Sequence, residues 1–381
     1  MANWHIITPE YPPQLGGVSD YVPLVAGGLA SGGDPVHVWT VPIPDPSPPI
    51  AGVVVHRTLG KFSRRDLRAL DAMLDLHPSP RRLFVQWVPH GYGYRSMNVA
   101  FCLWLWRRAR RHGDIVDMMV HEPSLPFREG SWRQDAAAAI HRVMTVILMR
   151  AATRVWYSTP AWEGRWRPYA LGRSVPFGWL PLPSTIPIAP PDSETLELRK
   201  RFAPRSEILI GHFGTFGPLI RELLLRVLPL LPRSLPPYAI VLIGPGGAAV
   251  AEALVAQRPD LAGRIHATGP LAPANVTPYL NACEVLFQPY PDGVTARRTS
   301  FMAGLALGRP TVTTIGALTE SFWETSGSAL FARPGETHRM VTSLTTLVTN
   351  SGERERVGES GRKLYQERFD VRHIIAALQN T

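Results

Sequence analysis

The sequence predicts an α/β protein in which two Rossmann-like, doubly wound domains lie in tandem and face a cleft. The chain has 381 residues, more than the ~250–300 residues at which a single hydrophobic core stops growing. Short apolar runs alternate with longer helical segments, as expected for a parallel sheet covered by helices on both faces. The alternation stops at the proline-rich segment Leu180–Pro191 and then restarts, so we expect the linker there or just after it.

In the first half, strands are predicted where short apolar runs end at Gly, Pro or polar residues. These runs are Trp4–Thr8, Val36–Val41, Val53–His56, Leu83–Val88, Ile115–Val120 and Arg154–Ser158. Helices are predicted between them, at Tyr21–Ala30, Ser63–Leu76, Ser96–His112 and Asp135–Ala152. Ser19 and Asp20 are favourable caps for the first helix, and Pro42–Pro49 can only be a loop.

The second half repeats the pattern. The predicted strands are Ile208–His212, Ala239–Ile243, Ile265–Thr268, Val285–Gln288 and Thr311–Thr314. The predicted helices are Ile220–Leu231, Ala248–Gln257, Pro273–Cys283 and Thr299–Leu307, and helical sequence fills most of Thr337–Gln379. Ligands of such sheets bind beyond the carboxyl ends of the strands, so the loops after the strands are where chemistry is expected.

Composition narrows the function classes. A 45% hydrophobic chain can bury real cores, and it contains no apolar run long enough to span a membrane. The two cysteines, Cys102 and Cys283, lie in apolar segments and are predicted to be buried thiols. The start of the sequence lacks the pattern of a signal peptide, so we expect a cytoplasmic protein.

The charge is strongly basic, with a net charge of +10. Only three of the 40 Lys and Arg residues are lysine, which reflects either coding bias or the use of arginine forks for anionic ligands such as diphosphates. Nucleic acid, anionic lipid and a nucleotide ligand all suit this charge, but no nucleic-acid-binding motif is present. The apolar run Met97–Trp106, followed by arginines, is either a buried helix with a basic end, which we favour, or a peripheral membrane contact.

Two loops of the first half carry candidate site residues. Gly16 and Gly17 follow the first strand and open the first helix, where paired glycines either present amides to an anion or form a tight turn. His121 ends a strand at the same edge of the sheet. It is either a hydrogen-bonded structural histidine or a group that bonds a sugar hydroxyl or polarises a reacting group.

The second half holds the strongest candidates. A turn at Asp292-Gly293 leads through Thr295, Arg297 and Arg298 to Ser300 at a helix start. Two arginines at a positive helix N-terminus suit a diphosphate, although a solvated surface pair is the alternative. Two other loops offer amides, a hydroxyl or charges to the same ligand, through Gly214, Thr215, Arg221, Gly316, Ala317, Leu318, Thr319 and Glu320. No Asp-x-Asp pair, zinc-ligand spacing, Gly-x-Ser-x-Gly or Walker loop is present.

In the order of these motifs, the chain resembles a GT-B fold glycosyltransferase, close to glycosyltransferase family 4. The resemblance rests on Pro9–Val18, His121-Glu122, Pro289–Pro310 and Gly316–Glu320 and covers nearly the whole chain. It implies metal-independent transfer of a sugar, with retention, from a nucleoside-diphosphate sugar to a hydroxyl of a glycan, lipid-linked or small-molecule acceptor. No cofactor is implied, and no oligomeric state is predicted.

The resemblance also assigns domains and roles. It implies an acceptor-side domain over residues 1–190, a donor-binding domain over 191–365 and a helix over 366–381 that crosses back to the first domain. Gly17 is expected to face the donor phosphate or the acceptor, His121 to lie near the donor sugar, and Asp292 to match the first acid of the family's Glu-x7-Glu motif. Gly316–Glu320 is expected to touch the sugar and the diphosphate or ribose. On the acceptor side, 42–49, 91–96 and 123–134 are expected to line the site.

The chain departs from the family pattern in its charges. The second acid would fall on Ser300 or Ala303, and the customary Arg and Lys after the first strand of the second domain are absent. We therefore expect Arg297 or Arg298 to supply positive charge in catalysis and Glu320 to replace the ribose-binding acid. Two other hypotheses remain: a non-catalytic GT-B homologue that acts as a nucleotide-sugar-binding or scaffold subunit, and a sugar-phosphate-processing enzyme on the same fold.

Overall fold

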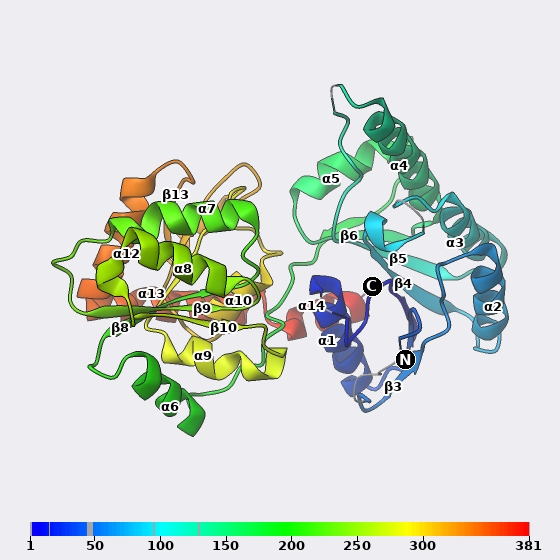
Figure 1. The fold of residues 1–381 in the computed structure, drawn as a ribbon. Helices are drawn as coiled ribbons and strands as arrows, with labels where there is room; N and C mark the ends of the chain where they lie inside the picture. Colours follow the sequence, from blue (N-terminus) through cyan, green and yellow to red (C-terminus); the bar gives the residue numbers. More distant parts are fainter. Residues whose placement is uncertain (1, 15, 44–48, 94–95, 129, 381) are drawn as a thin grey trace. The chain divides into compact units, whose positions relative to one another are not determined.

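The computed structural model describes residues 2–14, 16–43, 49–93, 96–128 and 130–380, which form two compact units (Figure 1). Unit 1 comprises Met1–Pro181 and Val371–Thr381, and unit 2 comprises Leu182–Asp370. The boundaries between the units therefore lie near residues 181 and 370, where the resemblance implied 190 and 365. The predicted linker segment 180–191 contains the first boundary.

Unit 1 is built on a seven-stranded sheet in the order β3-β2-β1-β4-β5-β6-β7, in which every neighbouring pair is parallel. The strands are β1 (Asn3–Ile7), β2 (Val36–Trp39), β3 (Val53–His56), β4 (Arg81–Trp87), β5 (Ile115–Val120), β6 (Arg154–Tyr157) and β7 (Phe177–Trp179). The helices are α1 (Gly17–Ser31), α2 (Arg64–Leu74), α3 (Val99–Arg111), α4 (Trp132–Ala151), α5 (Ala161–Trp166) and α14 (Val371–Gln379). The six predicted strands are confirmed, whereas α5 and the three-residue β7 were not predicted.

The chain returns to unit 1 in its last helix. Gly28 of α1 lies against Ile375 of α14, since a Cβ atom at Gly28 would come within 2.6 Å of that side chain. The Arg82 guanidinium on β4 donates to the carbonyl oxygen of Leu378 at 3.4 Å. The segment 371–379 is therefore part of the fold of unit 1 although it follows unit 2 in the sequence.

Unit 2 has a six-stranded parallel sheet in the order β10-β9-β8-β11-β12-β13. The strands are β8 (Ile208–Phe213), β9 (Tyr238–Ile243), β10 (Ile265–Gly269), β11 (Val285–Gln288), β12 (Thr311–Thr314) and β13 (Leu330–Ala332). The helices are α6 (Ser193–Phe202), α7 (Pro218–Val227), α8 (Gly247–Gln257), α9 (Thr277–Ala282), α10 (Thr299–Ala306), α11 (Phe322–Thr325), α12 (Thr337–Thr349) and α13 (Ser351–Arg368). The five predicted strands are confirmed.

Both faces of the unit 2 sheet are buried, as predicted. Along β9, Ile240 and Leu242 belong to one hydrophobic cluster, whereas Val241 and Ile243 belong to another. Successive side chains of a strand point to opposite faces, so each face carries its own core. This double coverage explains why the strand reads as a continuous apolar run rather than an alternating one.

The helical sequence from 337 to 379 was predicted as one region, and it forms three helices. The first break is at Asn350, whose side chain accepts a hydrogen bond from the Glu353 amide at 3.0 Å and so caps α13. The second break lies at Phe369–Asp370, where unit 2 ends. Phe369 is fully buried and stacks on Trp323, which fixes the end of α13 in the core of unit 2.

The segment Met97–Trp106 contributes to α3, and its apolar face is buried. Phe101, Cys102, Trp104 and Leu105 are at most 6% exposed. Cys102 and Cys283 are both buried free thiols, as predicted. None of the helices in the described parts of the chain is long and apolar enough to cross a membrane.

Four histidines gather on one face of the unit 1 sheet. His5, His37 and His56 come from neighbouring strands, and His77 from the loop after α2. The His37 Nδ1 and His56 Nε2 atoms lie 3.1 Å apart, and the ring centroids of His37 and His77 lie 4.2 Å apart. Burial, together with the mutual repulsion of their charged forms, lowers the pKa of His5 to about 3 and that of His37 to about 4.

Unit 1 is therefore expected to lose stability in mild acid. In the unfolded chain these histidines bind protons near their ordinary pKa of 6.5, whereas in the folded chain His5 and His37 bind them only near pH 3–4. Their contribution to the free energy of unfolding is therefore fully present above pH 6.5 and decreases as the pH falls below that value. Urea unfolding at pH 7.5 and pH 5.0 tests this, and His37→Gln is expected to reduce the difference. His338→Gln, at an exposed position in unit 2, is the control. Equal stability of the wild type at both pH values would contradict the lowered pKa values.

Candidate functional site

Two loops of unit 2 are in backbone contact at the carboxyl edge of its sheet. Gly293 follows β11 with a φ of +84°, and a Cβ atom there would overlap the backbone nitrogen of Gly316, which follows β12. A Cβ atom at Gly316 would overlap the carbonyl oxygen of Asp292. The Gly316 amide donates to Thr319 Oγ1 at 2.9 Å. Because β11 and β12 are neighbours, the predicted turns 292–293 and 316–319 form one continuous surface.

The two predicted arginines face one carboxylate. Arg298 forms an ion pair with Asp292, and Arg297 Nη2 lies 3.6 Å from the other Asp292 oxygen. The Arg298 guanidinium also covers the Tyr290 ring, 4.7 Å from its centroid. Each arginine side chain is only about a quarter exposed (24% and 25%), so the pair is held in the loop rather than solvated on the surface. Two positive charges and one negative charge leave an excess of positive charge at this turn.

Glu320 is hydrogen-bonded to the backbone of the segment that carries the two arginines. Its carboxylate accepts hydrogen bonds from the Ala296 amide at 3.1 Å and from Trp323 Nε1 at 2.8 Å. The residue is 8% exposed, and this burial raises its pKa. The carboxylate thus fixes the backbone just before Arg297 and Arg298. Its predicted contact with ribose stays a prediction.

The other predicted residues of unit 2 divide by location. Gly214 follows β8, and a Cβ atom there would lie 3.9 Å from Ser300 Oγ. The Ser300 hydroxyl lies 2.9 Å from Tyr290 Oη. Thr295 is fully buried, and its Oγ1 has no hydrogen-bond partner among the described residues. The remaining four stand at or near the surface: Thr215, Arg221 and Ala317 are exposed, and Leu318 is half-buried. Ala303, the alternative position of the second acid, lies in the core, where a carboxylate would be unpaired.

In unit 1, His121 is a buried, neutral histidine. It follows β5, is 5% exposed, and its burial lowers its pKa to about 3. Its Nε2 lies 2.9 Å from Gln86 Oε1. Because a carbonyl oxygen only accepts, Nε2 carries the proton and Nδ1 keeps its lone pair. Nδ1 is buried without a partner in the described parts of the chain, so its lone pair is an unused hydrogen-bond acceptor.

Gly16 and Gly17 differ in what they allow. Gly16 precedes α1, and a Cβ atom there would lie 2.7 Å from a carboxylate oxygen of Glu10. Gly17 is the first residue of α1, is exposed, and has open space where a Cβ atom would stand. The N-terminus of α1 therefore has no side-chain cap at Gly16. It presents bare backbone at the position where an anion was predicted.

Glu10 and His90 are functional candidates that the sequence analysis missed. His90 stands between two carboxylates, with Nδ1 3.2 Å from Glu122 and Nε2 3.7 Å from Glu10. Glu10 follows β1, His90 follows β4 and Glu122 follows β5. These three strands are neighbours in the sheet, so only the sheet order brings the residues together. Burial raises the pKa of Glu10. In the predicted acceptor segments, residues 44–48, 94–95 and 129 lie outside the described residues.

Within the described ranges, no three His, Cys, Asp or Glu side chains are arranged to hold a metal ion. No protein-family model matches the sequence, and no curated protein matches it in sequence.

Solved structures do resemble it over their whole length. Sucrose-phosphate synthase from Thermosynechococcus elongatus has a TM-score of 0.72 at 16% identity, covering 100% of this chain and 98% of that chain. HepE from Anabaena, in complex with UDP-glucose, has a TM-score of 0.68 at 14% identity and coverages of 100% and 99%. An α,α-trehalose-phosphate synthase from Burkholderia vietnamiensis has a TM-score of 0.64 at 13% identity, and the match covers 100% of this chain and 98% of that chain. The chain has the GT-B fold that these proteins share, as the sequence predicts.

Proposed function

We propose that the protein is a glycosyltransferase that moves a sugar from a nucleoside-diphosphate sugar to an acceptor hydroxyl, with retention and without a bound metal ion. The observation that carries the proposal is the turn of Asp292, Arg297 and Arg298 in backbone contact with the 316–319 turn. The structures of HepE with UDP and with UDP-glucose support a nucleotide-sugar donor for this fold.

The arginines meet the main chemical demand of the reaction. When the sugar leaves, the nucleoside diphosphate gains negative charge, which must be stabilised by fixed positive groups when no metal is bound. Arg297 and Arg298 are already ordered by Asp292, so little reorganisation is needed when the diphosphate binds. The amides of the 316–319 turn and the N-terminus of α10 add partial positive charge.

We assign His121 to the sugar. Its neutral state leaves the Nδ1 lone pair unused, and this atom accepts a hydrogen bond from a sugar hydroxyl once the side chains that bury it move apart. No protein nucleophile is required if the acceptor attacks from the leaving-group face, because a diphosphate oxygen then takes the acceptor's proton. We also propose a cytoplasmic location, which two buried unpaired cysteines support, since disulfides are rare there.

Calorimetric titration with UDP, GDP and ADP, followed by turnover assays with the matching nucleotide sugars, tests the proposal. Binding of one nucleotide and transfer from its sugar would support it. Binding without transfer to any acceptor of a broad panel would favour a non-catalytic nucleotide-sugar-binding subunit, and release of phosphate without an acceptor would favour a sugar-phosphate-processing enzyme. If the protein binds none of the three nucleotides, the proposal is contradicted.

A further inference from the structure

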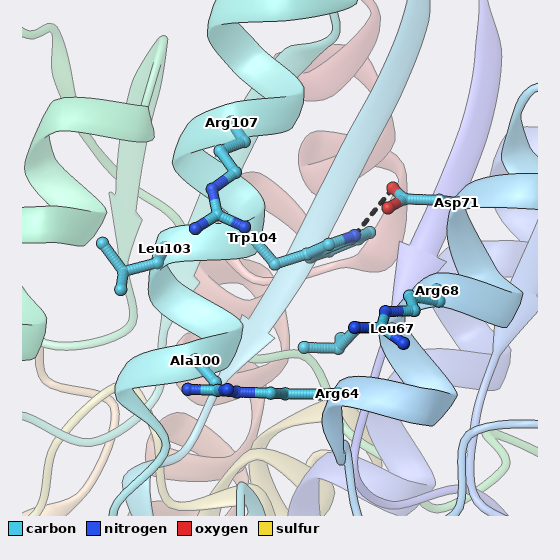
Figure 2. Close-up of a pocket in the computed structure, with 8 residues that line it drawn as sticks. All are labelled: Arg64, Leu67, Arg68, Asp71, Ala100, Leu103, Trp104 and Arg107. Atoms are coloured by element: carbon cyan, nitrogen blue, oxygen red, sulfur yellow. Dashed lines mark hydrogen bonds between the residues drawn. The ribbon is translucent and has the colours of Figure 1, made fainter.

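A second basic site lies in unit 1, outside the residues assigned to glycosyl transfer. A cavity of about 270 Å³ lies between α2 and α3 (Figure 2). Its lining comprises Arg64, Leu67, Arg68 and Asp71 from α2 and Ala100, Leu103, Trp104 and Arg107 from α3. Three arginines thus surround a space whose remaining walls are mostly apolar.

These three arginines differ from the other arginines at this face of unit 1. Arg81 and Arg108 are buried and form ion pairs with aspartates. Arg64, Arg68 and Arg107 are exposed, and within the described residues none of them forms an ion pair or side-chain hydrogen bond with the protein. Arg64 and Arg68 are four residues apart on α2, a like-charge spacing that disfavours the helix.

The one carboxylate in the lining does not neutralise them. Asp71 Oδ1 accepts a hydrogen bond from Trp104 Nε1 at 2.7 Å, the contact drawn as a dashed line in Figure 2. The same oxygen lies 3.3 Å from Arg108 Nη1. Asp71 therefore holds the indole of Trp104 in the cavity wall. It shares Arg108 with Asp75 and Asp114, so it offsets only part of the charge of the three lining arginines, and a net positive charge remains at the cavity.

We propose that this cavity binds a phosphate group. Guanidinium forks match phosphate oxygens in a bidentate manner, and three of them on facing helices can surround one phosphate. The apolar wall formed by Leu67, Leu103 and Trp104 then contacts the carbon part of the ligand. A larger cavity of about 570 Å³ shares Arg64 and Ala100 with the first and leaves room for the rest of a phosphate-bearing molecule. Unlike the phosphate cavity, this larger one is also lined by Gly91 and Gly93 of the predicted acceptor segment. The phosphate belongs either to a soluble phosphate ester or to a phospholipid headgroup.

Trp104 gives a local readout that the donor site of unit 2 does not disturb. The protein is labelled with 5-fluorotryptophan, and the Trp104 resonance is assigned with Trp104→Phe. Titration with inorganic phosphate is expected to shift this resonance in a saturable manner. The triple variant Arg64→Gln/Arg68→Gln/Arg107→Gln is expected to weaken phosphate binding at least about tenfold, because each charged hydrogen bond contributes to affinity.

The matched control is Arg65→Gln/Arg110→Gln/Arg111→Gln. It removes the same charge from exposed positions of the same two helices, none of which lines the cavity. The control is expected to keep the wild-type phosphate affinity. An equal loss of phosphate affinity in both triple variants would show a diffuse electrostatic effect and would overturn the proposal. An unchanged phosphate titration of the Trp104 resonance in the Arg64→Gln/Arg68→Gln/Arg107→Gln variant would also overturn it.

Vesicles distinguish the two sources of phosphate. Wild-type and control proteins are mixed with phosphatidylglycerol or phosphatidylcholine vesicles and separated by flotation. If the ligand is a headgroup, both proteins float with phosphatidylglycerol and the lining variant does not. If it is soluble, phosphate shifts the Trp104 resonance and no protein floats. Absence of both the shift and the flotation would overturn the proposal.

Discussion

Arg297→Ala and Arg298→Ala are each expected to lower kcat for sugar transfer about 10²–10³-fold, the usual loss when one preorganised donor to a developing negative charge is removed. Both guanidinium groups are held by Asp292 in the turn that contacts Gly316, and their charge would stabilise the departing diphosphate. Arg298→Lys is expected to recover only part of the activity, because a lysine keeps the charge but loses the planar fork.

The measurement is steady-state kinetics with the donor identified by the nucleotide titrations. Arg226→Ala is the control, since Arg226 is an arginine of unit 2 that pairs with Glu222 on the outer surface of α7. Thermal unfolding of each variant separates loss of catalysis from loss of the fold. Wild-type turnover in both Arg297→Ala and Arg298→Ala would show that the diphosphate is stabilised elsewhere.

The largest effect on stability is expected from Asp114→Ala, which should lower the free energy of unfolding of unit 1 by about 3–5 kcal/mol. Asp114 is 3% exposed, and its two carboxylate oxygens each lie 2.7 Å from a guanidinium nitrogen, one from Arg81 and one from Arg108. Removing the carboxylate leaves both buried arginines with one partner fewer, and burial of a charge without its partner is costly.

Urea unfolding followed through the tryptophans of unit 1 measures this loss. Glu163→Gln is the matched control in the same unit, because Glu163 pairs with an exposed arginine one helical turn away. Such a surface pair contributes about 0–1 kcal/mol. A loss in Asp114→Ala no larger than in the control would mean that Arg81 and Arg108 find other partners, such as Asp75.

Most strands could be predicted from the sequence because the central strands of each parallel sheet bury both faces and read as short apolar runs. Elements without such a run were missed. β13 has only three residues, and α5 has six. α6 carried a signal that was overlooked: Asp192 caps it and Thr195 bonds back to the Asp192 amide, a reciprocal arrangement visible in the sequence spacing.

The candidate site was predictable only in part. The Asp292-Gly293 turn and the two arginines were found because turn residues, charges and a helix start lie together in the sequence. The contact of Glu320 with the Ala296 amide depends on the order of β11 and β12, and the grouping of Glu10, His90 and Glu122 depends on three strands that are distant in sequence. No local pattern records such contacts, because they arise only when the sheet forms.

The tight apposition of Gly293 and Gly316 also bears on protein engineering. Any larger residue at either position would force the two turns apart, so a library designed to change sugar preference should leave both codons untouched. Ala317 is exposed and Leu318 is half-buried on the same turn, and both can be randomised without disturbing that apposition.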